Sequence, residues 1–244
     1  MTIIANGSNN QFSKYRKFSK YGAANNYGDG ISGIRTDGSV TMLDIVSNCD
    51  TAVAFDGTND YLTVPASSDF NFGTGDLTIE AWIYWDGTYS GGGRVIYATG
   101  GSASLDQFGI FSGAGLYFGG VYNNVAANYP PINTWSHVAA TRSGTTIKIY
   151  VNGVETASGT QASSIGNSGV TAYIGYRGSD GNHPWKEKIS NLRIVKGTAL
   201  YTKDFSIPVL PLGSPSGTVL LTCTGDKIED IRDSNHSISV TNDL

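Results

Sequence analysis

The acidic residues near the middle of the chain are the first groups that could do chemistry. Glu80 stands in an apolar run, with Asp76 and Asp86 at the two ends of that run. Retaining glycoside hydrolysis needs two carboxyl groups about 5 Å apart, usually spaced along one strand face. The spacing Glu-x-Asp-x-(x)-Glu, which would supply such a pair, does not occur. We therefore expect Glu80 to be a structural residue, hydrogen-bonded beneath a loop, and the chain not to be an enzyme.

A glycine pattern and the three histidines are two further features that could indicate a cofactor-binding site. Residues 28–33 spell G-x-G-x-x-G, but a dinucleotide site also needs a strand before the pattern and a helix after it, and neither flank has that character. His137, His183 and His236 lie far apart, without the His-x-x-x-His spacing of a zinc site. Two cysteines, Cys49 and Cys223, are too few for a multi-cysteine zinc site. We expect no cofactor. We favour two free thiols, and a Cys49–Cys223 pair, which could form if the chain ends meet, is the alternative.

Aromatic residues near the expected loops could bind sugars. A sugar ring stacks on an exposed aromatic ring, and planar polar groups at the edge hydrogen-bond its hydroxyls. The candidate carbohydrate-binding residues are Trp85, Tyr89, Arg177, Asp180 and Asn182. They lie in or next to two expected loops, so binding requires that the fold brings those loops together.

The composition of the 244-residue chain favours β-structure. Charged residues make up 15%, below the roughly 25% of an average globular chain. The 32 glycines and 14 tyrosines suit pleated strands joined by tight turns. A net charge of −4 argues against a nucleic-acid partner. The longest uncharged stretch contains prolines, asparagines and glycines, so we expect no membrane insertion.

Short strand patterns with turn signals between them run from Thr51 onward. Asn152-Gly153 predicts a hairpin turn, because both residues tolerate positive φ. Residues 198–205 are the one segment in which a helical turn is expected. Many short strands without an amphipathic helix indicate an all-β fold, an antiparallel β-sandwich or jelly roll. The strands are expected at residues 52–55, 61–64, 77–85, 94–97, 108–111, 116–118, 135–141, 146–151, 154–156, 172–175, 189–195, 219–223 and 238–240, with Trp82, Trp135, Ile79, Ile83, Ile149 and Ile174 buried.

Four blocks of sequence resemble laminin-G-like, concanavalin A-like jelly-roll domains. FDGTNDYLTVPASSDFNFGTGDLTIEAWIY (55–84) is similar to the opening of that family, and TWSHVAATRSGTTIKIYVNGV (134–154) to its middle hairpin. AYIGYRG (172–178) and ISNLRIVKGTALYTKDF (189–205) are similar to its closing strands. The resemblance covers about residues 51–223 and implies a concanavalin A-like jelly roll. KGTALYTKDF, followed by a proline-containing link and LLTCTGD, looks most like copies in bacteriophage virion proteins.

The resemblance also carries expectations for particular residues. Glu187 stands where relatives commonly have glycine, and Trp185 where they have an aromatic residue that packs into the sandwich. Relatives often hold one Ca²⁺ with loop oxygens, and calcium needs about six to eight such ligands. Asx-Gly pairs are also ordinary turn chemistry, so no metal site is predicted and calcium is kept as the alternative. The loop oxygens in question belong to Asp56, Asn59, Asp60, Asp180 and Asn182.

The first 48 residues differ from the rest and lie outside the resemblance. They contain Lys14, Arg16, Lys17 and Lys20 and a Gly/Asn-rich stretch, and could bury little apolar surface alone. We expect residues 1–48 to form an extended N-terminal arm that docks on a partner, and residues 49–244 to form the jelly roll. The residues expected at assembly contacts with sister subunits or other virion proteins are Ile3, Ile4, Phe12, Tyr15, Phe18, Tyr21, Ile31 and Ile34.

These features together favour a structural protein of a bacteriophage virion. Such a protein, a head decoration, head fibre or tail fibre, would reach the exterior by lysis, and the first residues lack the apolar stretch of a secretory signal. The jelly roll would bind host-surface glycans weakly, if at all. The alternative is a free secreted or cell-surface carbohydrate-binding lectin or adhesin, which would need an export route.

Overall fold

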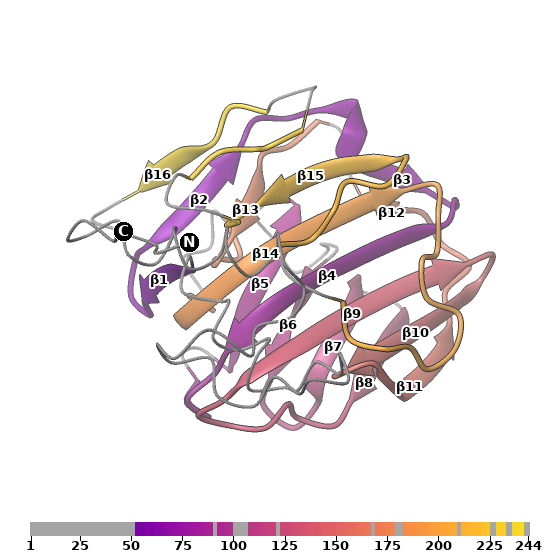
Figure 1. Cartoon of the computed structure of the whole chain (residues 1–244), viewed down its shortest axis with the longest axis horizontal. Coiled ribbons are helices and arrows are strands. Elements are labelled where there is room, and N and C mark those ends of the chain that lie inside the picture. Colours follow the sequence, from indigo (N-terminus) through magenta and orange to yellow (C-terminus); the bar gives the residue numbers. More distant parts are fainter. Residues whose placement is uncertain are drawn as a thin grey trace, which may run out of the picture. The chain divides into compact units, whose positions relative to one another are not determined.

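The structure of the protein is a computed structural model, and two antiparallel sheets form its β-sandwich (Figure 1). Sheet A lies in front and sheet B behind in this view. In the described part of the chain the one helical element is a 3-10 turn, η2 (Ser68–Phe70). The all-β prediction is confirmed. The structure describes residues 52–89, 92–99, 107–120, 123–166, 169–178, 183–208, 211–224, 228–232 and 236–241.

Sheet A has the strand order β1-β14-β4-β9-β10-β11, with β15 also paired to β14. The long strand β14 pairs with β1 along its first half and with β15 along its second half. The bounds are β1 (Val53–Asp56), β4 (Leu77–Tyr84), β9 (Trp135–Ser143), β10 (Thr146–Val151), β11 (Val154–Thr160), β14 (Lys186–Lys196) and β15 (Thr218–Thr222).

Sheet B has the order β16-β2-β13-β5-β6-β7-β8, and β3 and β12 form a separate short pair. The strands β3, β8 and β12 were not predicted, because their glycines and asparagines hide the alternating pattern. The bounds are β2 (Tyr61–Val64), β3 (Asn71–Gly73), β5 (Gly93–Thr99), β6 (Gln107–Phe111), β7 (Gly115–Gly120), β8 (Asn123–Ala127), β12 (Ile165–Gly166), β13 (Ala172–Ile174) and β16 (Ser239–Thr241).

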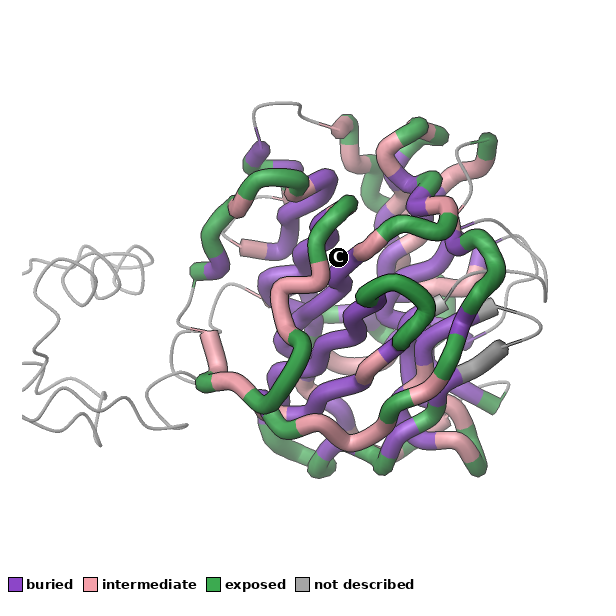
Figure 2. Tube along the Cα trace, turned by 90° about the vertical axis from the view of Figure 1, so that its right-hand side faces the viewer, coloured by how far each residue is buried: buried purple, intermediate pink, exposed green. Residues whose placement is uncertain are grey.

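The apolar core lies between the two sheets, and exposed segments run along the outside (Figure 2). Ile79 and Ile83 of β4 face this core, as alternation along a strand requires. All six side chains expected to be buried are buried. Trp82 and Trp135 lie outside the core cluster, on the outer face of sheet A, and further residues must cover that face to keep water from them.

Residues 197–208, which we call the strap, cover part of this outer face (Figure 1). The Thr78 hydroxyl donates to the Thr198 carbonyl at 2.9 Å and accepts from the Leu200 N–H at 2.9 Å. The Thr141 hydroxyl donates to the Tyr201 carbonyl at 2.9 Å. The strap is irregular, so the helical turn expected at residues 198–205 was wrong. Its backbone bonds to strand hydroxyls instead of to itself.

Positive φ angles occur at one hairpin turn and at one strand position that bear on the predictions. Asn152 (φ 51°) and Gly153 (φ 79°) join β10 to β11 as predicted. Glu187, where relatives commonly have glycine, has φ 85°, a region that non-glycine residues rarely adopt. The backbone conformation explains why glycine suits this position, and Glu187 keeps it within the β1–β14 ladder.

A bulge in β14 determines which residue lies opposite Glu80 in the paired strand. Ser190 pairs with Trp82, but the residue that pairs with Glu80 is Arg193 rather than Leu192. The extra residue is accommodated at Asn191, whose φ is 52°. Without the bulge, the regular two-residue alternation would place Leu192 opposite Glu80.

Several expectations concern residues outside the described ranges. Residues 1–51 include the whole predicted arm and its eight assembly-contact residues, as well as Cys49. Cys223 is a buried free thiol. None of the described residues form a helix with the length and hydropathy needed to cross a bilayer.

Candidate functional site

A buried polar network is centred on Glu80, on the outer face of sheet A. Glu80 Oε1 accepts from Arg193 Nη2 at 2.6 Å and from Nε at 2.9 Å. Glu80 Oε2 lies 3.0 Å from His137 Nε2 and accepts from the Tyr201 hydroxyl at 2.9 Å. The side chains of Glu80 and His137 have no exposed surface. Tyr201 and Phe205 of the strap stack above them, with ring centroids 3.6 Å apart.

The network holds Glu80 in its charged form. Burial raises its pKa, but the hydrogen bond and charge of His137 and the charge of Arg193 outweigh burial, so the pKa of Glu80 lies below its usual range. Burial and the neighbouring Glu80 raise the pKa of Tyr201. The contacts described for Glu80 are hydrogen bonds and ion pairs with other residues of the chain, as expected for a structural carboxylate beneath a loop. The sequence did not show that Arg193 and Tyr201 would be its partners.

A cluster of three aromatic rings, which we call the loop-end cluster, lies where the loops at one end of the sandwich meet. It consists of Trp85, Tyr89 and Tyr129. The ring of Tyr129 stacks on Trp85, with centroids 5.6 Å apart and planes 19° apart. Tyr89 lies 5.9 Å from Trp85 and 6.2 Å from Tyr129. Trp85 is 3% exposed, whereas Tyr129 is 42% exposed.

This exposure corrects the predicted role of Trp85. It was expected to offer its ring to a sugar, but it packs into the core and serves as the base on which Tyr129 stacks. Tyr89 is half-buried and also packs against the core. Tyr129 was missed, because the only signal for it is a tyrosine before two prolines in a loop. The structure therefore presents Tyr129, beside exposed Ile132, as the ring open to solvent.

Hydrogen bonds fix the orientation of Tyr129. Its hydroxyl donates to the Phe111 carbonyl at 3.2 Å and accepts from the Gly113 N–H at 2.8 Å. It also shares a hydrogen bond with the Tyr89 hydroxyl, and burial raises the pKa of Tyr89. A ring held at both its face and its hydroxyl loses little freedom on binding a ligand.

Arg94 ties the loops beneath the cluster together. Its side chain donates to the carbonyl oxygens of Pro184 (2.6 Å), Thr88 (3.1 Å) and Gly57 (3.4 Å), which belong to three different loops. Arg94 is 4% exposed, and burial lowers its pKa. The arginine thereby provides hydrogen bonds to carbonyl groups of loops, where a strand partner is lacking.

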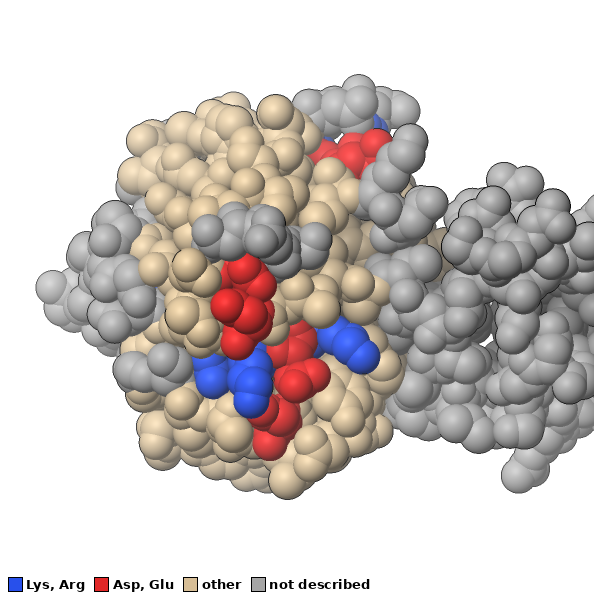
Figure 3. Space-filling view, turned by 90° about the vertical axis from the view of Figure 1, so that its left-hand side faces the viewer, with Lys and Arg blue, Asp and Glu red and all other residues tan. Residues whose placement is uncertain are grey.

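A surface ion pair adds polar groups beside the cluster. Lys186 Nζ donates to Asp86 Oδ2 at 2.7 Å, and Thr88 donates to Asp86 Oδ1 from its N–H (2.8 Å) and its hydroxyl (2.7 Å). Burial raises the pKa of Asp86, but these bonds lower it to about 2. Figure 3 shows acidic and basic side chains gathered side by side on one face of the molecule. Their charges offset one another locally.

Arg177 joins the same end of the sandwich through a chain of contacts. Its Nη1 lies 2.6 Å from His183 Nε2, and the His183 ring lies 5.2 Å from Phe111, whose carbonyl accepts from Tyr129. The structure thus brings Trp85 and Tyr89 into direct contact and places Arg177 in the adjoining loop. Asp180 and Asn182 lie outside the described residues.

Two of the carboxylates considered for calcium, Asp56 and Asp60, each have an oxygen that accepts hydrogen bonds from backbone N–H groups. Asp56 Oδ1 accepts from the N–H groups of Thr58 (2.7 Å), Asn59 and Asp60, and Asp60 Oδ2 accepts from the Asp56 N–H at 2.9 Å. This is the Asx-turn arrangement that the sequence favoured. Within the described ranges, no group of three or more His, Cys, Asp or Glu side chains is placed to hold a metal ion.

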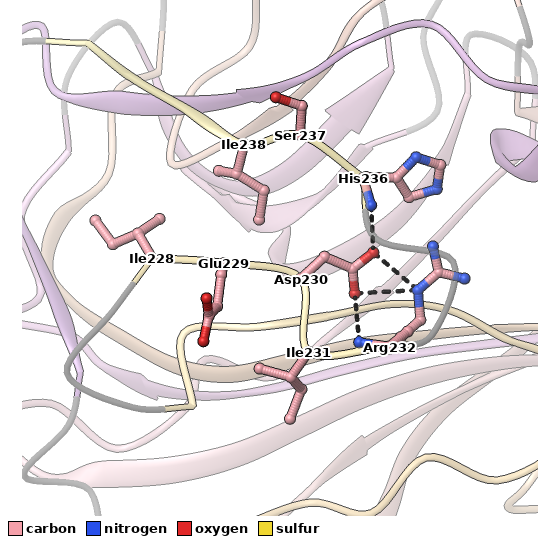
Figure 4. A pocket seen from close by; sticks show the side chains of 8 residues that line it. All are labelled: Ile228, Glu229, Asp230, Ile231, Arg232, His236, Ser237 and Ile238. Carbon is pink, nitrogen blue, oxygen red and sulfur yellow. Dashed lines mark hydrogen bonds and ion pairs between the residues drawn. The ribbon is translucent and has the colours of Figure 1, made fainter.

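A hollow of about 730 Å³ lies beside the C-terminal segment (Figure 4). Asp230 points toward Arg232, and its oxygens accept from Arg232 Nε (2.9 and 3.0 Å), the His236 N–H (3.1 Å) and the Leu221 N–H (3.2 Å). Because Leu221 belongs to β15 and His236 precedes β16, these bonds fasten one segment to both sheets. The polar groups of this hollow serve the fold.

Two antiparallel sheets around one apolar core, with an aromatic cluster among the loops at one end, define a lectin-like β-sandwich. The chain belongs to the concanavalin A-like lectin/glucanases superfamily, because the profile of that family matches residues 56–201, more than half of the chain. No curated protein sequence matches the chain.

Solved structures of other proteins are similar to this chain, and the one with a TM-score above 0.5 supports the same fold. A candidate carbohydrate-binding protein of Bacteroides ovatus has 21% identity and a TM-score of 0.55; the match covers 78% of this chain and 60% of that one. The heptameric SAP-like pentraxin of Limulus polyphemus has 15% identity and a TM-score of 0.49, covering 78% and 93%. Tailspike protein 2 of bacteriophage CBA120 has 11% identity and a TM-score of 0.46, covering 72% and 32%. The likeness to the Bacteroides protein at 21% identity concerns the fold alone, and this chain spans about three fifths of that protein.

Proposed function

We propose that the chain is a non-enzymatic structural protein of a bacteriophage virion that displays a lectin-like jelly roll and binds glycans weakly at the loop-end cluster. Membership of the lectin/glucanases superfamily supports the binding module. The resemblance of residues 196–205 and 220–226 to phage virion proteins supports the setting. Residues 1–48 are the proposed attachment to sister subunits or other virion proteins.

The exposed ring of Tyr129 is the observation that carries the binding proposal. One face of the ring is stacked on buried Trp85, its hydroxyl is hydrogen-bonded, and 42% of the residue remains open to solvent. A sugar ring can stack its C–H face on such a platform. The Arg177 guanidinium, linked to Tyr129 through His183 and Phe111, is the proposed source of planar donors. Affinity at the millimolar level, about −4 kcal/mol for each site, is sufficient when many copies act together on one particle.

Multivalent display on a glycan array tests this binding. We expect a restricted set of glycans to be retained, with and without calcium, and Tyr129→Ala to reduce that signal at least tenfold, because it removes an exposed ring that stacking requires. Tyr129→Phe keeps the ring and should retain most of the signal. Ile231→Ala, which trims another exposed apolar side chain (48%), is the matched control. An array that stays blank with the multivalent protein would favour a purely structural role.

The non-enzymatic part of the proposal rests on Glu80. Its carboxylate is fully buried and engaged by His137, Arg193 and Tyr201, so a substrate cannot reach it without displacing the strap. We expect no release of reducing sugar from β-glucans or other polysaccharides above a buffer blank. Release that disappears in Glu80→Gln would show that the protein is a glycosidase after all.

A further inference from the structure

Three tyrosines form a second aromatic group, in sheet B rather than at the loop end. We call Tyr61, Tyr173 and Tyr176 the tyrosine trio. The rings of Tyr61 and Tyr176 are stacked, with centroids 4.6 Å apart and planes 14° apart. Tyr173 lies 5.8 Å from Tyr61 and 6.4 Å from Tyr176. All three residues are half-buried, so each retains some surface in contact with water.

The trio lies on the outer face of sheet B. Along β2, Leu62 and Val64 are buried in the core, whereas Tyr61 and Thr63 alternate with them and are half-exposed. Tyr173 pairs with Thr63 across β13 and β2, so its side chain shares their face. β16, β2 and β13 lie side by side in Figure 1.

Hydroxyl groups border the rings. Across β16 and β2, Thr241 pairs with Tyr61 and Ser239 with Thr63, which puts both side chains on the outer face. On this face the described residues of β2, β13 and β16 are tyrosine, threonine and serine, without a charged group among them. These strand positions offer a ligand C–H···ring contacts and neutral hydroxyl groups, and none of them carries a positive charge.

The backbone holds the trio in place before any ligand arrives. Tyr61 and Tyr173 stand in paired strands. Tyr176 follows β13 directly after Gly175, whose N–H donates to the Ile96 carbonyl at 3.0 Å and whose carbonyl accepts from the Trp185 N–H at 2.7 Å. Rings fixed in this way lose little conformational entropy when a flat ligand packs on them.

We infer that the tyrosine trio is a second carbohydrate site, which takes a neutral sugar ring from an uncharged oligosaccharide. Three half-buried rings expose far less than the roughly 800 Å² that each partner buries in a stable protein interface, whereas they match a single sugar ring. The inference rests on the proposed function only in that both sites bind sugars, since the trio shares no residue with the loop-end cluster. Two sites of this kind on one module would raise its avidity for a polymer.

Site-resolved NMR of the full chain carrying 3-fluorotyrosine tests the inference. The ¹⁹F resonances are assigned by single Tyr→Phe variants, and the probes are cellohexaose and maltohexaose. We expect resonances of Tyr61, Tyr173 and Tyr176 to shift with a saturable, millimolar dependence on at least one probe. Tyr176→Ala should weaken that dependence at least tenfold, Tyr173→Phe by less than threefold because the ring remains, and Tyr129→Ala should leave it unchanged.

The outcomes separate this site from the loop-end cluster. A shift at Tyr129 with unchanged trio resonances would overturn the inference and leave the proposed function standing. Shifts at the trio with Tyr129 unchanged would support the inference and count against the loop-end cluster. If no tyrosine resonance responds to either probe, the trio is not a site for neutral sugars.

Discussion

Replacement of Glu80 by alanine is expected to lower the free energy of unfolding by about 3–5 kcal/mol, the usual effect of removing one partner from a buried ion pair. The variant leaves the Arg193 guanidinium, 7% exposed in its side chain, without its carboxylate. His137 and Tyr201 lose the same acceptor. The strap then loses the hydrogen bond from Tyr201 to Glu80, which attaches it to sheet A.

A matched control lies on the same sheet. Glu155 pairs with Lys148 at 2.7 Å, but the two side chains are 31% and 27% exposed, so Glu155→Ala should cost less than about 1 kcal/mol. Urea denaturation of both variants measures the difference. Equal losses in the two variants would show that burial of the Glu80 network contributes nothing.

The same network predicts a dependence of stability on pH. Because the pKa of Glu80 in the folded chain lies below its usual value near 4.5, its stabilising contribution is complete above that value. The contribution is lost as the pH falls through the lower pKa of the folded state. Urea titrations below pH 5 should therefore show a steeper loss of stability in the unmodified chain than in Glu80→Ala.

Deletion of residues 1–48 is expected to abolish incorporation into particles while leaving a soluble, folded jelly roll. Ordering a polar, Gly/Asn-rich segment costs roughly 1–2 kcal/mol of backbone entropy for each residue, which contacts with a partner must offset. The described strands of the jelly roll lie within residues 53–241, outside the deleted segment. Particle incorporation is measured by sedimentation of assembled particles and immunoblotting of the pellet.

Tyr129→Ala is the control for the deletion, since it alters the proposed binding surface and should be incorporated normally. A deletion variant that still enters particles, or one that fails to fold, would contradict the assignment of residues 1–48 as the docking arm.

Strand alternation and turn chemistry were enough to predict the sandwich. The β4 run is apolar on both faces, Asn152-Gly153 is a two-residue turn, and the closing blocks have the family order, so the positions of the main strands along the chain and an antiparallel sandwich could be predicted. The bulge at Asn191 could not be predicted from the sequence, because it depends on a single residue adopting φ 52°. Without it the pairing of Arg193 with Glu80 cannot be derived.

The loop-end cluster was anticipated only in part. Trp85 and Tyr89 are two of its three rings, but the sequence could not say which ring would face solvent. Trp85 directly follows the core strand β4, and its side chain packs into the same core. Tyr129 belongs to a loop whose sequence has no periodic pattern. Exposure of a loop side chain depends on neighbours that are distant in sequence, such as Phe111 and Gly113.

The location of the protein on an assembled particle tests the central claim most directly. Purified particles would be imaged by electron cryomicroscopy, with the chain identified by mass spectrometry of the same preparation. We expect a β-sandwich on the outer surface of the head or tail, attached through residues 1–48, with the loop-end cluster directed away from the particle. Absence of the chain from purified particles, with secretion of the intact protein by its host cell, would contradict the virion role and favour a free lectin or adhesin.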